Sequence, residues 1–358
     1  MADDGWAVRQ GEQGVHSVRL RLAATLGTTV VLATTSLILP TTAVATITDD
    51  SQYEDDTGAG SHNQEISSQV SFDLSKNGSG KSTGTVTAVG NWTPPACWYE
   101  PKYTPEAKEQ QYKDLVNTPL FSGKKEAQEG FENRFIKGHP YTDFNKEKSG
   151  EGMFWTSARD DSRIGDDAIW ACDKADFWVD NGETPDVENA IDAETLAGLA
   201  YSRIQVPDTK VTLAPEQSTK VNLPTWAWLD ATDFHEVSVT ASLDVAGWNL
   251  SATTTAKPVS LKLEPGTADA TTYPANGECT INADGSIGEP YAAGKAAKTP
   301  PCGVTYLRSS GGGAYKLKAT VTWEITWKGS NGEAGKLPNG VFGTTQDITV
   351  QEIQAVNR

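Results

Sequence analysis

Short runs of alternating apolar and polar residues fill the chain from Val206 onward, separated by Pro, Gly and Asn. In the clearest run, Val321, Trp323, Ile325 and Trp327 alternate with Thr and Glu, as in a strand with one buried face. About seven such runs over residues 206–358 predict an antiparallel β-sandwich of immunoglobulin-like or PKD-like type. The runs are 211–213, 220–223, 237–245, 250–255, 260–263, 315–327 and 346–356.

Two further patterns make local predictions about strands. Apolar positions of one parity in 66–74 and of the other in 85–89 flank a turn-rich segment, 75–84, which predicts a β-hairpin. In the last run, Ile348 and Val350 share one parity and Ile353 the other. We therefore expect a β-bulge near Gln351 and Glu352.

Residues 92–205 have a different texture, rich in tryptophan and charge and poor in alternation. Thr104 followed by Pro105 is a typical N-cap and first helical position, and predicts a short helix over 106–116. Asp192 precedes a second short helix that places Leu196 and Leu199 on one face and ends near Arg203. Residues 66–205 are thus predicted to form a loop-rich region, and the fold class is mainly β.

The first 45 residues are typical of an export signal. Arg19 and Arg21 precede an uncharged stretch, 22–39, and Ala43-Val44-Ala45 fits a signal-peptidase site. The same stretch is long enough for an uncleaved membrane anchor, which remains an alternative. Residues 46–65 are polar and acidic without apolar periodicity, which predicts a disordered tether. We expect a secreted or cell-envelope protein.

The protein is strongly acidic. Its net charge is −17, and removing residues 1–45, with three basic and three acidic side chains, leaves 27 basic against 44 acidic, still −17. Such a surface repels phosphate groups and anionic lipids. We therefore expect no nucleic-acid partner, and membrane contact only through an uncleaved N-terminal segment.

Four cysteines follow the predicted signal, and an even number in an oxidising compartment predicts disulfides. Three pairings are possible. Proximity in the sequence and the predicted division at residue 206 favour Cys97 with Cys172 and Cys279 with Cys302. A zinc site would require close Cys/His spacing, which these residues do not have, and we expect no metal or other cofactor.

The segment 76–83 ends in the Gly-Lys-Ser-Thr core of a phosphate-binding loop. Gly78, Gly80, Lys81 and Ser82 would be its nucleotide-binding residues, which makes an ATP/GTP-binding protein one alternative function. However, Ser75 stands where that motif needs glycine, and a β-branched segment follows where it needs a helix. We favour a loop between strands.

No catalytic constellation is evident. The chain has no Gly-x-Ser-x-Gly motif, and only His62, His139 and His235 remain beyond the predicted signal. The abundance of carboxylates makes a glycosidase-type pair untestable from sequence. A hydrolase that depends on His139 or His235 is left as an alternative, and we predict that the protein is not an enzyme.

Tryptophan supplies a second binding hypothesis. Trp226 with Trp228, or Trp323 with Trp327, would project to one side of a strand, and aromatic faces bind sugar rings. Packing in a β-sandwich core predicts the same pattern and is favoured here. A module that binds cell-wall glycans is therefore kept as an alternative.

Several segments together resemble a known family. The stretches 221–229 (VNLPTWAWL), 300–310 (PPCGVTYLRSS) and 321–327 (VTWEITW) resemble exported actinobacterial proteins with a PKD-like domain, and 91–101 (NWTPPACWYEP) resembles a streptomycete branch often labelled ATP/GTP-binding. The resemblance covers most of the chain beyond the signal. It implies an exported β-rich protein and no established activity, and the Asp-Gly turn of broader PKD-like relatives is missing after Gly266.

The sequence as a whole predicts a non-catalytic interaction or structural protein outside the cytoplasm. Its partner would be an extracellular protein or a cell-wall component.

Overall fold

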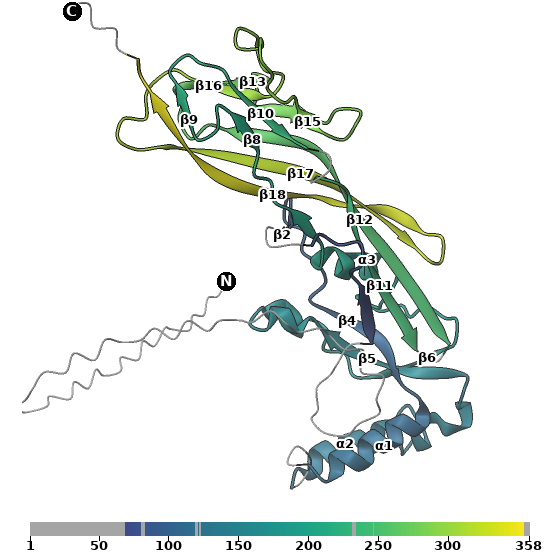
Figure 1. Ribbon diagram of the computed structural model, residues 1–358. Coiled ribbons are helices and arrows are strands. Elements are labelled where there is room, and N and C mark those ends of the chain that lie inside the picture. The colour runs from purple at the N-terminus through teal and green to yellow at the C-terminus, as the bar shows by residue number, and fades with distance from the viewer. Residues whose placement is uncertain are drawn as a thin grey trace, which may run out of the picture. The chain divides into compact units, whose positions relative to one another are not determined.

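The computed structural model describes residues 69–353, apart from 80–82, 119–120, 122, 231–233 and 246. In this part of the chain the fold is mainly β, with antiparallel sheets and three α-helices (Figure 1). The predicted signal at 1–45, the predicted tether at 46–65 and His62 lie outside the described residues.

Three long strands form the centre of the largest sheet. Its order is β1 (Val70–Asp73), β11 (Val237–Val245), β12 (Trp248–Glu264), β17 (Tyr315–Gly329), β18 (Ala334–Gln351) and β3 (Thr87–Ala88). In addition, β14 (Glu278–Thr280) pairs with β12, and β9 (Ser218–Lys220) pairs in parallel with β18. Alternate residues of β17 are buried from Leu317 to Trp327, as its sequence predicts.

A second sheet shares the core of the first. Its order is β13 (Ala270–Tyr273), β16 (Gly303–Tyr306), β10 (Thr225–Leu229) and β15 (Ile287–Gly288), with β8 (Thr212–Ala214) also paired to β10. Ring contacts join it to the long strands, since Tyr306 stacks on Tyr315 with centroids 5.2 Å apart. We call the continuous set of buried residues that joins both sheets, and to which side chains from 97–99, 155–179 and 190–206 also belong, the sheet core.

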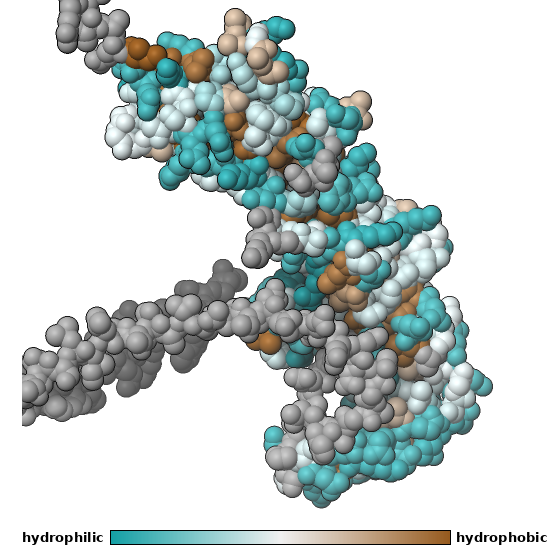
Figure 2. Space-filling model, in the orientation of Figure 1, coloured by the Kyte–Doolittle hydropathy of each residue, from teal (hydrophilic) through white to brown (hydrophobic). Residues whose placement is uncertain are grey.

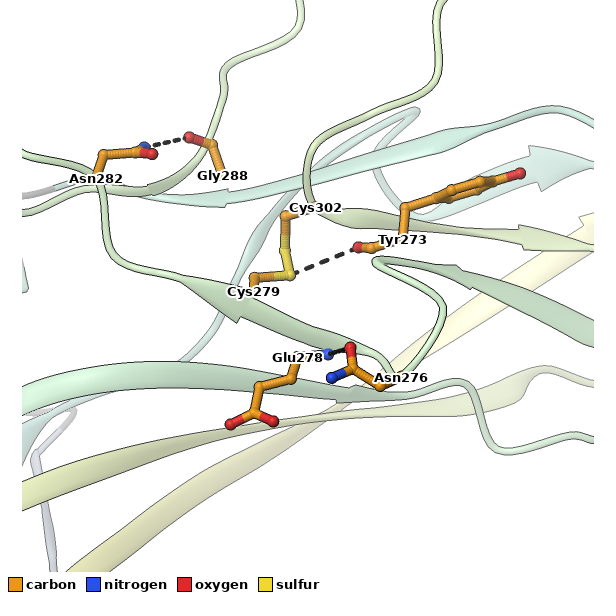
Figure 3. The surroundings of a disulfide bond; sticks show 7 residues. All are labelled: Tyr273, Asn276, Glu278, Cys279, Asn282, Gly288 and Cys302. Carbon is orange, nitrogen blue, oxygen red and sulfur yellow. Dashed lines mark hydrogen bonds between the residues drawn. A yellow bond between two sulfur atoms is a disulfide. The ribbon is translucent and has the colours of Figure 1, made fainter.

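Both expected disulfides are present. Cys279 lies on β14 of the large sheet and Cys302 directly precedes β16 of the second sheet, so this bond joins the two (Figure 3). The Sγ atom of Cys279 lies 3.6 Å from the carbonyl oxygen of Tyr273. The other bond, Cys97 to Cys172, joins residues 75 positions apart.

The helix α3 (Ala193–Ser202) begins at Asp192, whose side chain accepts a hydrogen bond from the backbone N–H of Thr195. It is apolar nearly all round and packs on β11, β12 and β17. A helix with this composition must be covered on several sides. Thr254 of β12 donates to the carbonyl of Ala197, and Trp92 stacks on Tyr201 with centroids 5.1 Å apart.

A smaller lobe is built on the sheet β4 (Cys97–Tyr103), β5 (Gly152–Arg159) and β6 (Phe177–Asp180). The helices α1 (Pro105–Val116) and α2 (Lys125–Phe135) and the 3-10 helix η1 (Asp143–Lys148) belong to it. Phe135, Phe144 and Phe154 form a separate buried group, which we call the aromatic cluster. The two faces of this sheet therefore serve different cores, because Phe154 lies in the aromatic cluster and Trp155 in the sheet core.

Both short helices predicted from the sequence are confirmed, but α2 was not predicted. Its first residue follows Lys124, whose side chain makes no capping hydrogen bond. Gly130 in its interior further weakens the helical signal. The remaining signal is the pair Phe131 and Phe135, which are four residues apart and whose rings lie 4.6 Å apart.

The predicted hairpin of 66–74 with 85–89 is wrong. β1 pairs with β11, and β3 pairs with β18. Between them, β2 (Thr83–Thr85) pairs with β7 (Gln205–Pro207). The correct partners lie more than a hundred residues away, and alternation reveals which face of a strand is buried but not which strand pairs with it.

The predicted bulge near Gln351 and Glu352 is also wrong, because β18 ends at Gln351. Register shifts occur instead between Pro258 and Ser260 of β12, and between Trp323 and Ile325 of β17. The first shift lies between the runs 250–255 and 260–263, which are one continuous strand. Proline removes a ladder donor, so the sequence at this position reads as two strands.

The sheets also cross the expected boundary at residue 206. β1 and β3 precede it in the chain, and both belong to the sheet of β11 to β18. The helix α3 precedes it as well and packs on that sheet.

Candidate functional site

The segment that resembles a phosphate-binding loop lies between β1 and β2, as expected of a loop between strands. Asn77 is bound to the turn after α3, since its side chain donates to the carbonyl of Arg203 and accepts from the N–H of Gln205. The N–H of Gly78 donates to the carbonyl of Gln205 at 3.0 Å. This N–H is therefore already engaged within the protein. Gly80, Lys81 and Ser82 lie outside the described residues.

The four tryptophans of the glycan hypothesis are mostly buried. Trp226, Trp323 and Trp327 are 2%, 0% and 9% exposed, and only Trp228 is half-buried. Trp323 packs on Phe234 with centroids 5.1 Å apart. Trp323 and Trp327 belong to the sheet core, where burial of large aromatic side chains stabilises the sheets. Trp226 is covered instead by Tyr291 and Lys295, so the three buried rings do not form an exposed platform for sugars.

The two described histidines lie in different settings. His235 lines a shallow hollow with Glu236, Lys257 and Asp284. His139 lies in the connection between α2 and η1, where its backbone N–H donates to the carbonyl of Asn133. A second shallow hollow on β12 and β17 is lined mainly by the hydroxyls of Ser and Thr.

No group of three or more His, Cys, Asp and Glu side chains suited to a metal ion occurs among the described residues. Within the same part of the chain, no helix is long and apolar enough to cross a membrane.

The most distinctive surface feature is the loop between β5 and β6, from Asp160 to Cys172, which we call the apolar loop. It carries two large apolar side chains in solvent, since Ile164 is 79% and Trp170 is 61% exposed. Single exposed apolar residues are ordinary, whereas apolar residues that gather on one surface mark interaction sites. The tryptophan is the more informative of the two, because this residue is enriched where proteins bind other proteins.

Covalent and polar bonds hold the apolar loop at both ends. Asp160 begins the short 3-10 helix η2 (Asp161–Arg163) and accepts from the N–H and the hydroxyl of Ser162, at 3.1 and 2.6 Å. At the other end, Cys172 is bonded to Cys97 of β4. The backbone N–H of Asp160 donates to the carbonyl of Ala96 at 2.9 Å. Both ends are therefore anchored on the segment at the start of β4.

The middle of the loop is fixed by one arginine. Arg163 donates to Asp166 through Nε at 3.1 Å, and through a second nitrogen to the carbonyl of Pro94. Asp166 in turn caps the 3-10 helix η3 (Asp167–Trp170) by accepting from the N–H of Ala168 at 2.9 Å. These bonds lower the pKa of Asp166, the backbone hydrogen bond from Ala168 most and the side chain of Arg163 next.

The exposed indole of Trp170 packs against an arginine side chain. The guanidinium carbon of Arg159, at the end of β5, lies 4.1 Å from the centroid of the Trp170 ring. A cation at this distance from an aromatic face attracts it and restricts its motion. The loop thus presents Trp170 in a restrained position, which reduces the entropy lost when a partner covers it.

The charge around these side chains is negative. Residues 159–174 contain five Asp, two Arg and one Lys, a net charge of −2. Asp161, Asp167 and Asp173 are exposed, whereas Asp160 is buried. The site therefore combines an apolar contact with an acidic surround, which suits a cationic protein surface. No pattern in the sequence locates this site, because tryptophan and isoleucine are usually buried and only the fold leaves Trp170 and Ile164 in solvent.

Comparisons with known proteins add no relative: no protein-family model matches the chain, and neither a curated protein nor a solved structure does.

Proposed function

We propose that this protein acts outside the cytoplasm by binding another protein, and that the apolar loop is its contact surface. The observation that carries this proposal is the exposed Trp170, packed on Arg159, together with the exposed Ile164 on one loop that is held by the disulfide Cys97–Cys172. Two disulfides support an oxidising compartment, since such bonds are rare in reducing ones. The activity is non-catalytic binding.

The partner is a protein with a basic surface around an apolar recess. Trp170 and Ile164 supply the apolar anchors, and the exposed aspartates Asp161 and Asp167 form an acidic rim. Anchors of this kind dominate binding free energy, while rim charges raise the association rate and select the partner. The acidic rim disfavours the other surface that takes exposed tryptophan, an anionic lipid bilayer.

The two sheets that share the sheet core serve as the scaffold that holds the loops in place. Their antiparallel strands and the disulfide between the sheets support an immunoglobulin/PKD-like sandwich as the closest architectural class. In that class, binding residues often lie on loops while the sheets hold them in place.

Photo-crosslinking tests the proposal. The photoreactive amino acid benzoylphenylalanine is placed at Ile164 and, as a control, at Leu307, which is 51% exposed and lies outside the loop. Cells that make the protein are irradiated, and adducts are identified by mass spectrometry. We expect one protein adduct from position 164 that disappears with Trp170→Ala and weakens in high salt, and no such adduct from position 307.

Either of two results would overturn the proposal: no protein adduct from position 164, or the same adducts from both positions. A lipid adduct from position 164, together with binding to phosphatidylglycerol vesicles that Trp170→Ala abolishes, would assign the loop to a membrane instead.

A further inference from the structure

The lobe contains a lysine in a position where a free ammonium ion is unfavourable. Lys108 lies on α1, and its side chain is 1% exposed. Its Nζ atom lies 4.5 Å from the ring centroid of Phe135, 4.8 Å from that of Tyr103 and 5.3 Å from that of Phe131. Lysine is almost never fully buried unless it is paired. Figure 2 shows that the outer surface of the α1–α2 pair is mostly hydrophilic. The ammonium group of Lys108 does not lie on that surface but among aromatic rings beneath it.

The partner of Lys108 is Asp176, which directly precedes β6 and whose side chain is 20% exposed. Its Oδ2 atom pairs with Nζ of Lys108. The backbone of Asp176 is fixed by Arg134 of α2, whose Nε and Nη2 atoms donate to the Asp176 carbonyl at 3.1 and 2.7 Å. Arg134 of α2 therefore fixes the backbone that places this carboxyl group against the amine of α1.

A third side chain orients the amine. The Oε1 atom of Gln111 accepts a hydrogen bond from Nζ of Lys108 at 2.7 Å, and Nε2 of Gln111 donates to the hydroxyl of Tyr103 at 3.1 Å. Burial raises the pKa of Tyr103 to about 12, so this hydroxyl stays neutral at ordinary pH. With one N–H directed at Gln111, the nitrogen can present its lone pair to the Asp176 carboxyl carbon once it has lost a proton.

The surroundings favour that loss of a proton. Burial lowers the pKa of Lys108 below its ordinary value, although the carboxylate of Asp176 opposes the shift. Ion pairs taken out of water lose hydration that their mutual attraction only partly replaces. Transfer of a proton from Nζ to the carboxylate gives a neutral amine beside a neutral carboxylic acid, and a desolvated lysine amine is a competent nucleophile.

From this geometry we propose that Lys108 and Asp176 condense to form an intramolecular isopeptide bond. The lone pair of Nζ attacks Cγ of Asp176 and forms an N–C bond. One carboxyl oxygen leaves as water with two protons that came from the ammonium group. An ammonium and a carboxylate thus become an amide and one water, with no oxidant, reductant or other reactant.

The product fits the site better than the ion pair does. The amide is neutral, so its burial does not require hydration of two charges to be replaced. Its N–H keeps the acceptor that Nζ already has, Oε1 of Gln111. The bond would join α1 to the start of β6, four residues after the disulfide at Cys172, so both cross-links would close the chain around α1 and α2.

Mass spectrometry of the full chain tests the proposal. The purified protein is reduced, alkylated, denatured and digested. We expect peptides containing Lys108 and Asp176 to appear as one branched species lighter by one water than their sum, with fragment ions that locate the bond. The unlinked Lys108 peptide should be nearly absent.

Three variants complete the experiment. Lys108→Met and Asp176→Ala should each abolish the branched species and restore linear peptides. Lys113→Met, at an exposed position of the same helix that pairs with Glu109, should leave it unchanged. Linear Lys108 and Asp176 peptides from the folded wild-type protein would overturn the proposal and assign the pair as an ion pair. That result does not depend on whether either variant folds.

Discussion

The sheet core and the aromatic cluster are packed on opposite faces of the β4–β5–β6 sheet and are stabilised differently. Adjacent residues of β5 show the division. The ring of Phe154 lies 5.4 Å from that of Phe135 in the cluster, and the ring of Trp155 lies 5.1 Å from that of Trp248 at the start of β12. Consecutive side chains of a strand point to opposite faces, so one strand contributes to both.

The sheet core is large and apolar, and it joins two sheets and a helix. The aromatic cluster is small and has a lysine at its edge. Apolar area is the main stabiliser of the first, and the disulfide Cys279–Cys302 adds one cross-link between its two sheets. The lobe around the second depends in addition on directed bonds, among them the disulfide Cys97–Cys172, the pair Lys108–Asp176 and the hydrogen bonds of Arg134. A small lobe whose own core is limited thus relies on cross-links for part of its stability.

The largest expected effect comes from opening the sheet core. Trp323→Ala removes a fully buried ring and should lower the free energy of unfolding by about 3–5 kcal/mol, because the core cannot close around the cavity. Denaturation in urea measures it. Leu307→Ala, at an exposed position, should change it by less than about 0.5 kcal/mol. A loss below about 1 kcal/mol at Trp323 would contradict the role assigned to this core.

Removing the disulfide of the lobe should have the next largest effect. Cys97→Ser with Cys172→Ser opens a loop of 75 residues that contains α1 and α2, and should lower the stability of the lobe by about 2–4 kcal/mol. Hydrogen exchange should show faster exchange in α1 and α2 while β17 and β18 stay protected. Equal acceleration in both regions would show that they unfold as one unit.

Substitution of the N-cap residues of α3 and α1 should have smaller effects, one in each region. Asp192→Ala and Thr104→Ala each remove a side chain that accepts from a backbone N–H, at the start of α3 and of α1, and each should be destabilising by about 1 kcal/mol. Because α3 packs on the large sheet, we expect the first loss in global unfolding. The second should appear only as faster exchange in the lobe. A smaller loss in global unfolding for Asp192→Ala than for Thr104→Ala, with faster exchange in the lobe for Asp192→Ala, would show that the two helices are not stabilised by different regions.

The smallest expected effect is the dependence of the stability of the lobe on pH. Hydrogen bonds from Tyr112, Lys137 and Gln128 hold the pKa of Glu132 at about 2, below its ordinary value of 4.5. A carboxyl group whose pKa is lower in the folded state contributes stability above pH 4.5, and that contribution is lost as the pH falls toward 2. Glu132→Gln should therefore lower the melting temperature of the lobe at pH 6, with the difference from wild type vanishing near pH 2.

A matched change tests the cause of this acid effect. Glu129→Gln alters a more exposed residue of the same helix, which pairs with Lys125 at 3.5 Å, and should have little effect at any pH because exposed ion pairs contribute little. A loss at Glu132 that is the same at pH 6 and pH 2 would show that ionisation is not its origin.

Helix starts and the buried faces of strands could be predicted from the sequence, because residues close together in the chain determine them. The Thr104-Pro105 and Asp192 signals gave two helices nearly to the residue, because capping depends on side chains within one turn. Alternation gave β11 and the buried face of β17. The same reasoning failed for β1, whose partner β11 is far along the chain, and it missed α2, which is held by packing of the aromatic rings.

Composition and short-range periodicity were enough to predict the mainly β class and the acidic surface. They left three cysteine pairings open, of which proximity in the chain favoured the two that the structure contains. Tertiary structure alone decided which aromatic residues are functional candidates. Trp323 and Trp170 are the same residue type, yet one is buried in the sheet core and the other is exposed on a cross-linked loop. It also decided that Lys108 meets Asp176, 68 residues away. Burial and contact depend on distant segments, which no local pattern encodes.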